Sequence, residues 1–198
     1  MAKNIETKEE LKKIRDEIWN LKKSPLYKER LKNNAYPVIG EGSHSAEVVF
    51  IGEAPGKNEA ASGRPFCGRS GKVLDGLLDH IKLSRDDVYI TNIVKDRPTN
   101  NRDPKKEEIE LYAPFLDRQL EAIKPKIVVT LGRFSMEYII KRYGSEKDLL
   151  PISKIHGKKL NGKNFIILPL YHPAVSVYNR NTLQDLKKDF SVLKSLLK

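Results

Sequence analysis

The hydrophobic residues of this chain gather in four short runs that are rich in β-branched side chains. The runs occupy residues 48–52, 88–94, 127–131 and 165–170. Nearly continuous apolar runs of this length, without strict alternation, are typical of strands that are buried on both faces of a parallel sheet. The pattern therefore predicts a central, mainly parallel four-stranded sheet.

Helical periodicity fills the intervals between these runs. Helices are predicted at residues 70–82, 105–123, 135–143 and 183–197. Strands that alternate with helices are typical of an α/β fold. We expect a three-layer α/β/α sandwich that forms a single domain over residues 1–198, with a helical extension at residues 1–35 packed on it.

The predicted topology also locates a candidate site. Ligands of such sheets bind beyond the carboxyl ends of the strands. The first run leads into the loop GEAPG at residues 52–56, the second carries Asn92 near its end, and the last is followed by His172. We therefore expect Glu53, Asn92 and His172 to converge at one edge of the sheet.

Composition narrows the possible partners and cofactors. The 198 residues carry a formal net charge of +11, which favours a polyanionic partner such as nucleic acid. Cys67 is the only cysteine, so the chain can build neither a disulfide framework nor an all-cysteine metal site. No run approaches the roughly 20 apolar residues of a membrane span, so we expect a soluble, cytoplasmic protein that does not bind membranes.

Each residue that marks the predicted edge has a structural and a functional interpretation. Glu53 is either solvated in an ordinary Pro-Gly turn or held in the mouth of a cleft. Phe66 either anchors the core or offers a stacking face to an extruded base. Asn92 either bonds loop backbone or reads the edge of a base, because one amide both donates and accepts. His172 is either structural or catalytic.

Three sequence blocks carry a family resemblance. They are GEAPGKNEAASGRPFCGRSGKVLD, VYITNIVK and YHPAVSV, in this order. Together they resemble the uracil-DNA glycosylase superfamily, closest to its family four, over nearly the whole chain from residue 40 to the C-terminal helix. The resemblance implies a monofunctional base-excision repair enzyme, which flips uracil out of single- or double-stranded DNA and hydrolyses its N-glycosidic bond.

The resemblance also implies roles for individual residues. Glu53, Asn92 and His172 are the expected catalytic residues, and His172 stabilises the departing uracil anion. The expected uracil-binding residues are Ala54, Glu59, Phe66, which stacks on the base, and Asn92, which reads its edge. Six residues in the surrounding loops are expected to bind DNA, although each cation has a solvated surface charge as its alternative: Arg64, Arg69, Lys95, Arg97, Val177 and Tyr178. Val177 or Tyr178 either inserts into the duplex or merely packs the loop.

The chain departs from the family pattern at the positions that bind an iron-sulfur cluster. The resemblance to family four implies an enzyme in which four cysteines bind the cluster. The matching positions in this chain are Leu21, Ser24, Asp96 and Tyr112, none of which supplies a thiolate. We therefore predict no cluster, no other metal and no cofactor. Side-chain packing takes over the structural role of the cluster, and it is expected around four residues: Trp19, Leu21, Leu26 and Tyr112.

Other departures concern the chemistry itself. Ala54 stands where the best-known family has an aspartate that activates water, so this role falls to Glu53 or to positioning alone. Ala60 follows Glu59 where relatives commonly carry an aspartate. Residues 97–106 contain no histidine, so we predict turnover rather than covalent trapping, and we expect His156 to be structural or to face DNA.

Two alternatives to uracil excision stay open at this stage. One keeps the chemistry but changes the base to hypoxanthine or xanthine. The other is a binding module that recognises damaged or single-stranded DNA without cleaving it. For all three functions we expect a monomer.

Overall fold

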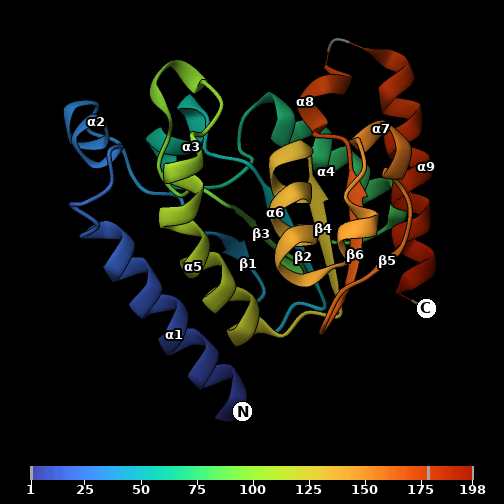
Figure 1. Cartoon of the computed structure of the whole chain (residues 1–198), viewed down its shortest axis with the longest axis horizontal. Coiled ribbons are helices and arrows are strands. Elements are labelled where there is room, and N and C mark those ends of the chain that lie inside the picture. The colour runs from blue at the N-terminus through green and yellow to red at the C-terminus, as the bar shows by residue number, and fades with distance from the viewer. Residues whose placement is uncertain (1, 178, 198) are drawn as a thin grey trace.

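The computed structural model describes residues 2–177 and 179–197, and it is built around a six-stranded sheet (Figure 1). The strand order is β1-β3-β2-β4-β6-β5. The strands are β1 (Glu41–Gly42), β2 (Val48–Gly52), β3 (Tyr89–Asn92), β4 (Ile127–Leu131), β5 (Leu160–Asn161) and β6 (Ile166–Leu170). The four central strands, β3, β2, β4 and β6, are mutually parallel, which confirms the predicted parallel core.

The predicted strand count of four was wrong, because the sheet has an additional strand at each edge. β1 pairs with β3 and β5 pairs with β6, both antiparallel. Each edge strand spans only two residues, which is too short to leave a periodic pattern in the sequence. Short edge strands leave few unpaired backbone groups exposed.

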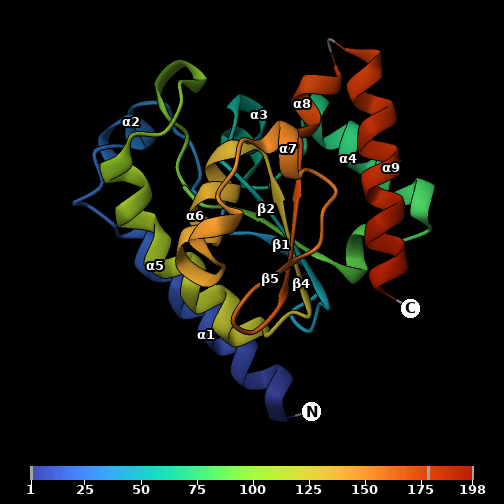
Figure 2. The ribbon, with the colours of Figure 1, turned by 45° about the vertical axis from the view of Figure 1, so that its right-hand side comes forward.

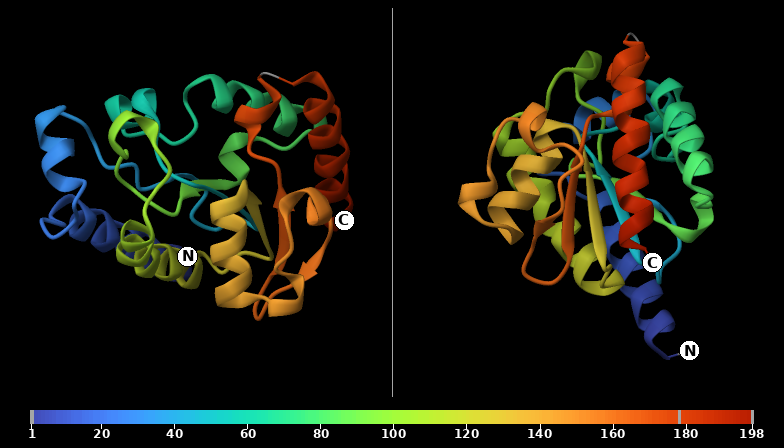
Figure 3. Two further views of the ribbon diagram at one scale, coloured as in Figure 1. Left: turned by 45° about the horizontal axis from the view of Figure 1, so that its top comes forward. Right: turned by 90° about the vertical axis from the view of Figure 1, so that its right-hand side faces the viewer.

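Helices cover both faces of the sheet, which confirms the three-layer α/β/α prediction (Figure 3). The α-helices are α1 (Ala2–Trp19), α2 (Tyr27–Lys32), α3 (Lys57–Ser62), α4 (Arg69–Ile81), α5 (Lys106–Ile123), α6 (Arg133–Tyr143), α7 (Ile152–Ile155), α8 (Pro173–Ser176) and α9 (Arg180–Leu196). Short 3₁₀ turns lie at η1 (Arg85–Asp87), η2 (Thr99–Asn101) and η3 (Glu146–Asp148). Within the described residues, no helix is both long enough and apolar enough to span a bilayer.

The two faces of the sheet form two separate hydrophobic cores. Val49 and Ile51 of β2 pack with α1, α5 and α6, whereas Val48 and Phe50 pack with α4 and α9. Successive residues of a strand point to opposite faces. Because both faces are covered by helices, every residue of β2 is buried, which explains its continuous apolar run.

Helix α1 packs along α5 (Figure 2). Ile14 and Ile18 bury their side chains completely in the core. Arg118 of α5 pairs with Glu10 and Glu17 of α1, at 2.8 and 2.6 Å. The expected helical extension therefore consists of α1 and α2, and it is held by both apolar and ionic contacts.

A buried polar network ties this extension to the segment that follows β3. The Tyr112 hydroxyl donates to the Asp96 carboxylate and lies 2.8 Å from Ser24 Oγ. Arg30 donates to both Asp96 oxygens at 3.0 and 3.1 Å. Burial raises the pKa of Asp96, while Tyr112 and Arg30 act to lower it.

This network joins the positions that the family resemblance aligns with cluster ligands. The Tyr112 hydroxyl bonds to both Ser24 and Asp96. Leu21 is also buried, and its carbonyl accepts the Ser24 N–H at 3.0 Å. Packing was expected to join α1 and α2 to the sheet at these positions. Leu21, Leu26 and Tyr112 do pack in the hydrophobic core, whereas Trp19 is 48% exposed. Hydrogen bonds and an ion pair add to this packing.

We predict that Asp96→Ala strongly destabilises the protein, because Arg30 would remain buried without a counter-charge. The expected fall in the free energy of unfolding is about 3–5 kcal/mol, measured by urea denaturation. Lys12→Ala is the matched control, because Lys12 forms an exposed ion pair with Glu9 at 2.7 Å. Equal, small effects of the two substitutions would show that the network does not hold the extension.

Candidate active site

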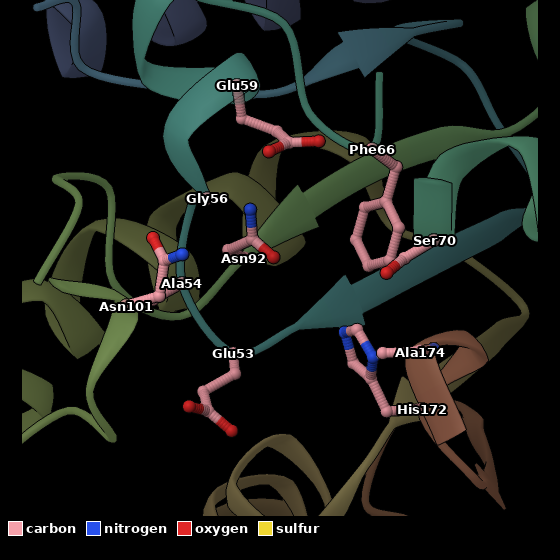
Figure 4. A pocket seen from close by; sticks show the side chains of 10 residues that line it. All are labelled: Glu53, Ala54, Gly56, Glu59, Phe66, Ser70, Asn92, Asn101, His172 and Ala174. Atoms are coloured by element: carbon pink, nitrogen blue, oxygen red, sulfur yellow. The ribbon is translucent and has the colours of Figure 1, made fainter. Parts of the chain in front are cut away.

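A pocket of about 370 Å³ opens at the carboxyl ends of the parallel strands (Figure 4). Its walls come from the loop after β2, the end of β3, the start of α4, the η2 turn and the start of α8. The lining residues are Glu53, Ala54, Gly56, Glu59, Phe66, Ser70, Asn92, Asn101, His172 and Ala174. The predicted convergence of Glu53, Asn92 and His172 is confirmed, and Ala54, Glu59 and Phe66 join them.

The pocket floor depends on Gly52, the last residue of β2. A Cβ atom at this position would lie 2.3 Å from Asn92 Oδ1 and 2.7 Å from Phe66 Cζ. Contacts of that length essentially do not occur. Glycine is therefore required here because an amide and an aromatic ring occupy the space of a side chain.

The side-chain amide of Asn92 is buried and has no partner. Asn92 is 2% exposed, and its amide forms no hydrogen bond with any residue that the structure describes. Buried polar groups are nearly always hydrogen-bonded in native proteins. Because this amide faces the pocket, its donor and acceptor are available to a ligand.

Lys95 supports the backbone of Asn92 from inside the protein. The expectation that Lys95 binds DNA was wrong. Lys95 is fully buried. Its ammonium donates to Asn92 O at 2.7 Å, Thr91 Oγ1 at 2.7 Å and Gln119 Oε1 at 2.6 Å. Burial lowers the pKa of Lys95 well below its usual value. The side chain turns inward because these acceptors satisfy it inside the protein.

Phe66 forms the aromatic wall of the pocket. Its ring stacks on the His172 imidazole, with centroids 5.6 Å apart and planes inclined by 29°. Its backbone has a φ of 48°, which is uncommon for a non-glycine residue. A Cβ at Gly71 would lie only 1.8 Å from the Phe66 carbonyl oxygen, so the loop packs directly on the first turn of α4.

Glu59 and Arg85 hold the Phe66 loop in this conformation. Glu59 Oε1 accepts the backbone N–H groups of Cys67 and Gly68 at 3.0 and 2.8 Å. Arg85 donates to the Phe66 carbonyl at 3.3 Å and also to the preceding carbonyl. Glu59 was expected to bind substrate. It lines the pocket, but one of its oxygens is already bonded to the loop backbone.

His172 is a neutral hydrogen-bond donor in this environment. Burial lowers its pKa to about 4, although the Glu59 carboxylate acts to raise it. Nδ1 accepts the Ala174 N–H at 3.2 Å. The neutral ring therefore carries its proton on Nε2.

Glu53 titrates near neutrality. Burial and the neighbouring charge of Asp103 raise its pKa to about 7, while Arg133 acts to lower it. Its carboxylate points away from the Phe66 ring (Figure 4). A carboxyl group with this pKa can take up a proton at physiological pH.

Sequence reasoning missed two polar residues of the pocket, Ser70 and Asn101. Ser70 lies in the first turn of α4, and Asn101 belongs to the η2 turn. Asn100 and Asn101 both have positive φ values, 56° and 55°. Two consecutive asparagines in the loop between β3 and α5 are the available signal, because asparagine tolerates this conformation better than most residues.

The remaining residues expected to bind DNA differ in their exposure and in their partners. Arg64 pairs with Glu41 at 2.8 Å rather than standing free. Arg69 is exposed at the start of α4, and Arg97 donates to Asn101 Oδ1 at 2.7 Å. Val177 is 37% exposed just after α8. The last of the set, Tyr178, lies outside the described residues.

Comparison with known proteins identifies the family. The model of the Uracil DNA glycosylase superfamily matches residues 39–194. The chain belongs to this superfamily. It is 46% identical to a type-4 uracil-DNA glycosylase of Sulfurisphaera tokodaii. The aligned region covers 94% of this chain and 84% of the relative. It is 42% identical to the type-4 uracil-DNA glycosylase of Archaeoglobus fulgidus. That aligned region covers 95% of this chain and 94% of the relative.

A solved structure has a weaker similarity. A UNG mutant from Nitratifractor salsuginis is 14% identical and covers 74% of each chain, with a TM-score of 0.39. This likeness is too low to inform the site of this superfamily member.

An iron-sulfur cluster does not fit this member of the superfamily. Cluster irons are held by cysteine thiolates, and the chain has one cysteine, Cys67. Cys67 lies in the Phe66 loop, whereas the aligned positions form the network around Asp96 and Tyr112. No group of three or more His, Cys, Asp and Glu residues that could hold a metal occurs among residues 2–177 and 179–197.

We predict that Arg85→Met loosens the Phe66 loop of this glycosylase-family fold, because two loop carbonyls lose their donor. Hydrogen exchange of the Cys67 and Gly68 amides should accelerate by about tenfold or more, measured by NMR. Arg64→Met is the control, because Arg64 shares Glu41 with Arg85. Unchanged exchange in Arg85→Met would remove this residue from the support of Phe66.

Proposed function

We propose that this protein is a monofunctional uracil-DNA glycosylase that removes flipped-out uracil from DNA. The observation that carries the proposal is the unpartnered, buried amide of Asn92. It faces the pocket between an aromatic wall, Phe66, and a neutral imidazole donor, His172. Such a site suits a flat, neutral base that offers hydrogen-bond groups along one edge.

Base selection is assigned to Asn92 and Phe66. The amide of Asn92 can donate to uracil O4 and accept from N3–H at the same time. Cytosine presents an amino group in place of O4 and lacks the N3 proton, so it leaves the amide mismatched. Phe66 supplies the stacking face, and Ala54 shapes the pocket beside it.

Bond cleavage is assigned to His172 and Glu53. As the bond between C1′ of the sugar and N1 of uracil breaks, its electron pair moves to the base. The Nε2–H of His172 stabilises the resulting anion at O2. A water molecule then adds to C1′, and Glu53 in its charged form orients this water and takes up its proton. Glu59 contributes by holding the Phe66 loop.

DNA contacts around the pocket are assigned to exposed groups. Arg69, Arg97 and, after release from Glu41, Arg64 are proposed to contact phosphates. Val177 or Tyr178 is proposed to fill the gap that the extruded base leaves in a duplex. The chain has no evident Schiff-base lysine and no histidine at residues 97–106, so the reaction ends with release of uracil.

The protein is further proposed to work without a cofactor, as a cytoplasmic monomer in which residues 1–198 form one domain. The network of Ser24, Arg30, Asp96 and Tyr112 supports this proposal, because it already joins the extension to the sheet. Absorbance of purified protein in the near-ultraviolet and visible range should show no iron-sulfur bands. A brown preparation with acid-labile sulfide would contradict this assignment.

The decisive experiment compares abasic-site formation on oligonucleotides that contain uracil or hypoxanthine. Wild type should act on uracil. His172→Ala and Asn92→Ala should each lower kcat/KM by about 10²–10³-fold, while DNA affinity persists. Excision of hypoxanthine alone would change the assigned base, and binding without excision would identify a non-catalytic module. Equal loss of DNA binding in the variants would show that these residues are structural.

The pKa of Glu53 predicts the pH dependence of excision. Its raised value means that the active, charged form accumulates as pH rises through about 7. kcat/KM should therefore rise with pH by up to tenfold per unit below 7 and level off above it. No limb from His172 is expected near neutrality, because its pKa is about 4. Glu53→Gln should abolish the limb, and a limb that persists in this variant would exclude Glu53 as its source.

A further inference from the structure

A second groove lies beside the pocket, between α2, α3 and the η2 turn. Its volume is about 260 Å³, and its lining includes Tyr36, Lys57, Arg97 and Asn100. The groove and the pocket share two walls. Helix α3 contributes Lys57 to the groove, and η2 contributes Asn100 to the groove and Asn101 to the pocket. The two cavities are therefore neighbours along α3 and η2.

Tyr36 lines this groove, and a second exposed aromatic side chain, Trp19, packs against Tyr36. Trp19 is 48% exposed and Tyr36 is 46% exposed, and they are the aromatic residues among the exposed large apolar side chains of the described chain. Their ring centroids lie 6.0 Å apart at an interplanar angle of 45°. Burial is the usual state of large aromatic side chains, so their exposure leaves faces free for stacking.

The main chain is hydrogen-bonded at both aromatic positions. The Tyr36 N–H donates to the Ala60 carbonyl of α3 at 2.7 Å. Arg30, which is itself fixed by Asp96, donates to the Trp19 carbonyl. The backbone beneath both rings is therefore fixed, and the rings contact each other, so less conformational entropy is lost when a ligand stacks on them.

The charge of the groove favours an anionic ligand. Lys57 is exposed and Arg97 is partly exposed, and neither forms a salt bridge within the described residues. Glu29 also lines the groove, but its carboxylate accepts a hydrogen bond from Asn33 at 2.9 Å. Arg30 is neutralised by Asp96. The two positive side chains without a salt bridge, Lys57 and Arg97, therefore outnumber the one such negative side chain, Glu29.

We propose that this groove binds the unpaired DNA strand next to the extruded nucleotide. One base stacks on the Trp19–Tyr36 pair, and the adjoining phosphates pair with Lys57 and Arg97. Aromatic platforms beside cations are the usual means of holding single-stranded nucleic acid without sequence preference. The proposal rests on the proposed function, because DNA seated in the pocket brings its own strand to the groove.

The test compares single-stranded oligonucleotides that carry one abasic-site analogue with flanks of two or about ten nucleotides. Fluorescence anisotropy gives the affinity of wild type and of a Trp19→Ala, Tyr36→Ala double variant. Wild type should bind the long strand more tightly. The double variant should lose this gain by about tenfold or more, with unchanged affinity for the short strand and unchanged kcat on uracil DNA. Trp19→Phe with Tyr36→Phe should restore the gain.

Leu150→Ala is the matched control, because Leu150 is 45% exposed on a different segment. Lys57→Ala should reduce the slope of log affinity against log salt concentration for the long strand by about one. Equal binding of the long strand by wild type and the double variant would overturn the proposal, as would equal losses on both strands. Absence of uracil excision would reject the proposed function alone, since anisotropy still decides whether the groove holds DNA.

Discussion

The close approach of Asn92 and Phe66 over Gly52 is the contact on which the rest of the site depends. No side chain at Gly52 fits beneath them, since its Cβ would lie 2.3 Å from the amide oxygen and 2.7 Å from the ring. The parallel register places Gly52 opposite Asn92 in β3. The same sheet edge brings in His172 after β6, so three distant segments form one pocket.

The groups around this contact fix the polar side chains of the pocket, and few of these side chains carry a full charge. Lys95 fixes the backbone of Asn92 from inside, and Glu59 and Arg85 fix the loop of Phe66. Burial keeps His172 neutral and holds Glu53 close to its midpoint at neutral pH. A site with fixed donors and little bound charge is suited to stabilising an anion that forms only during bond cleavage.

The sequence predicted the parallel core because burial on both faces leaves a strong local pattern, as β2 and β4 show. It also predicted the convergence of Glu53, Asn92 and His172, since the carboxyl ends of parallel strands lie at the same edge of the sheet. It did not predict the burial of Lys95, because that depends on acceptors such as Gln119 from a distant helix. The pairing of Arg64 with Glu41 was missed for the same reason, and the two-residue edge strands have no periodicity to detect.

The kinetics of Gly52→Ala and Gly76→Ala show whether the space over Gly52 is required for excision. Gly76 lies in α4, where an added Cβ meets no atom within 4 Å, so this variant controls for loss of glycine alone. Neither glycine has a positive φ, so the added Cβ strains neither backbone, and circular dichroism with thermal unfolding first verifies that both variants are folded. We predict that Gly52→Ala lowers kcat/KM for uracil excision by about 10²-fold while Gly76→Ala stays close to wild type. Equal activity of the two folded variants would contradict the account.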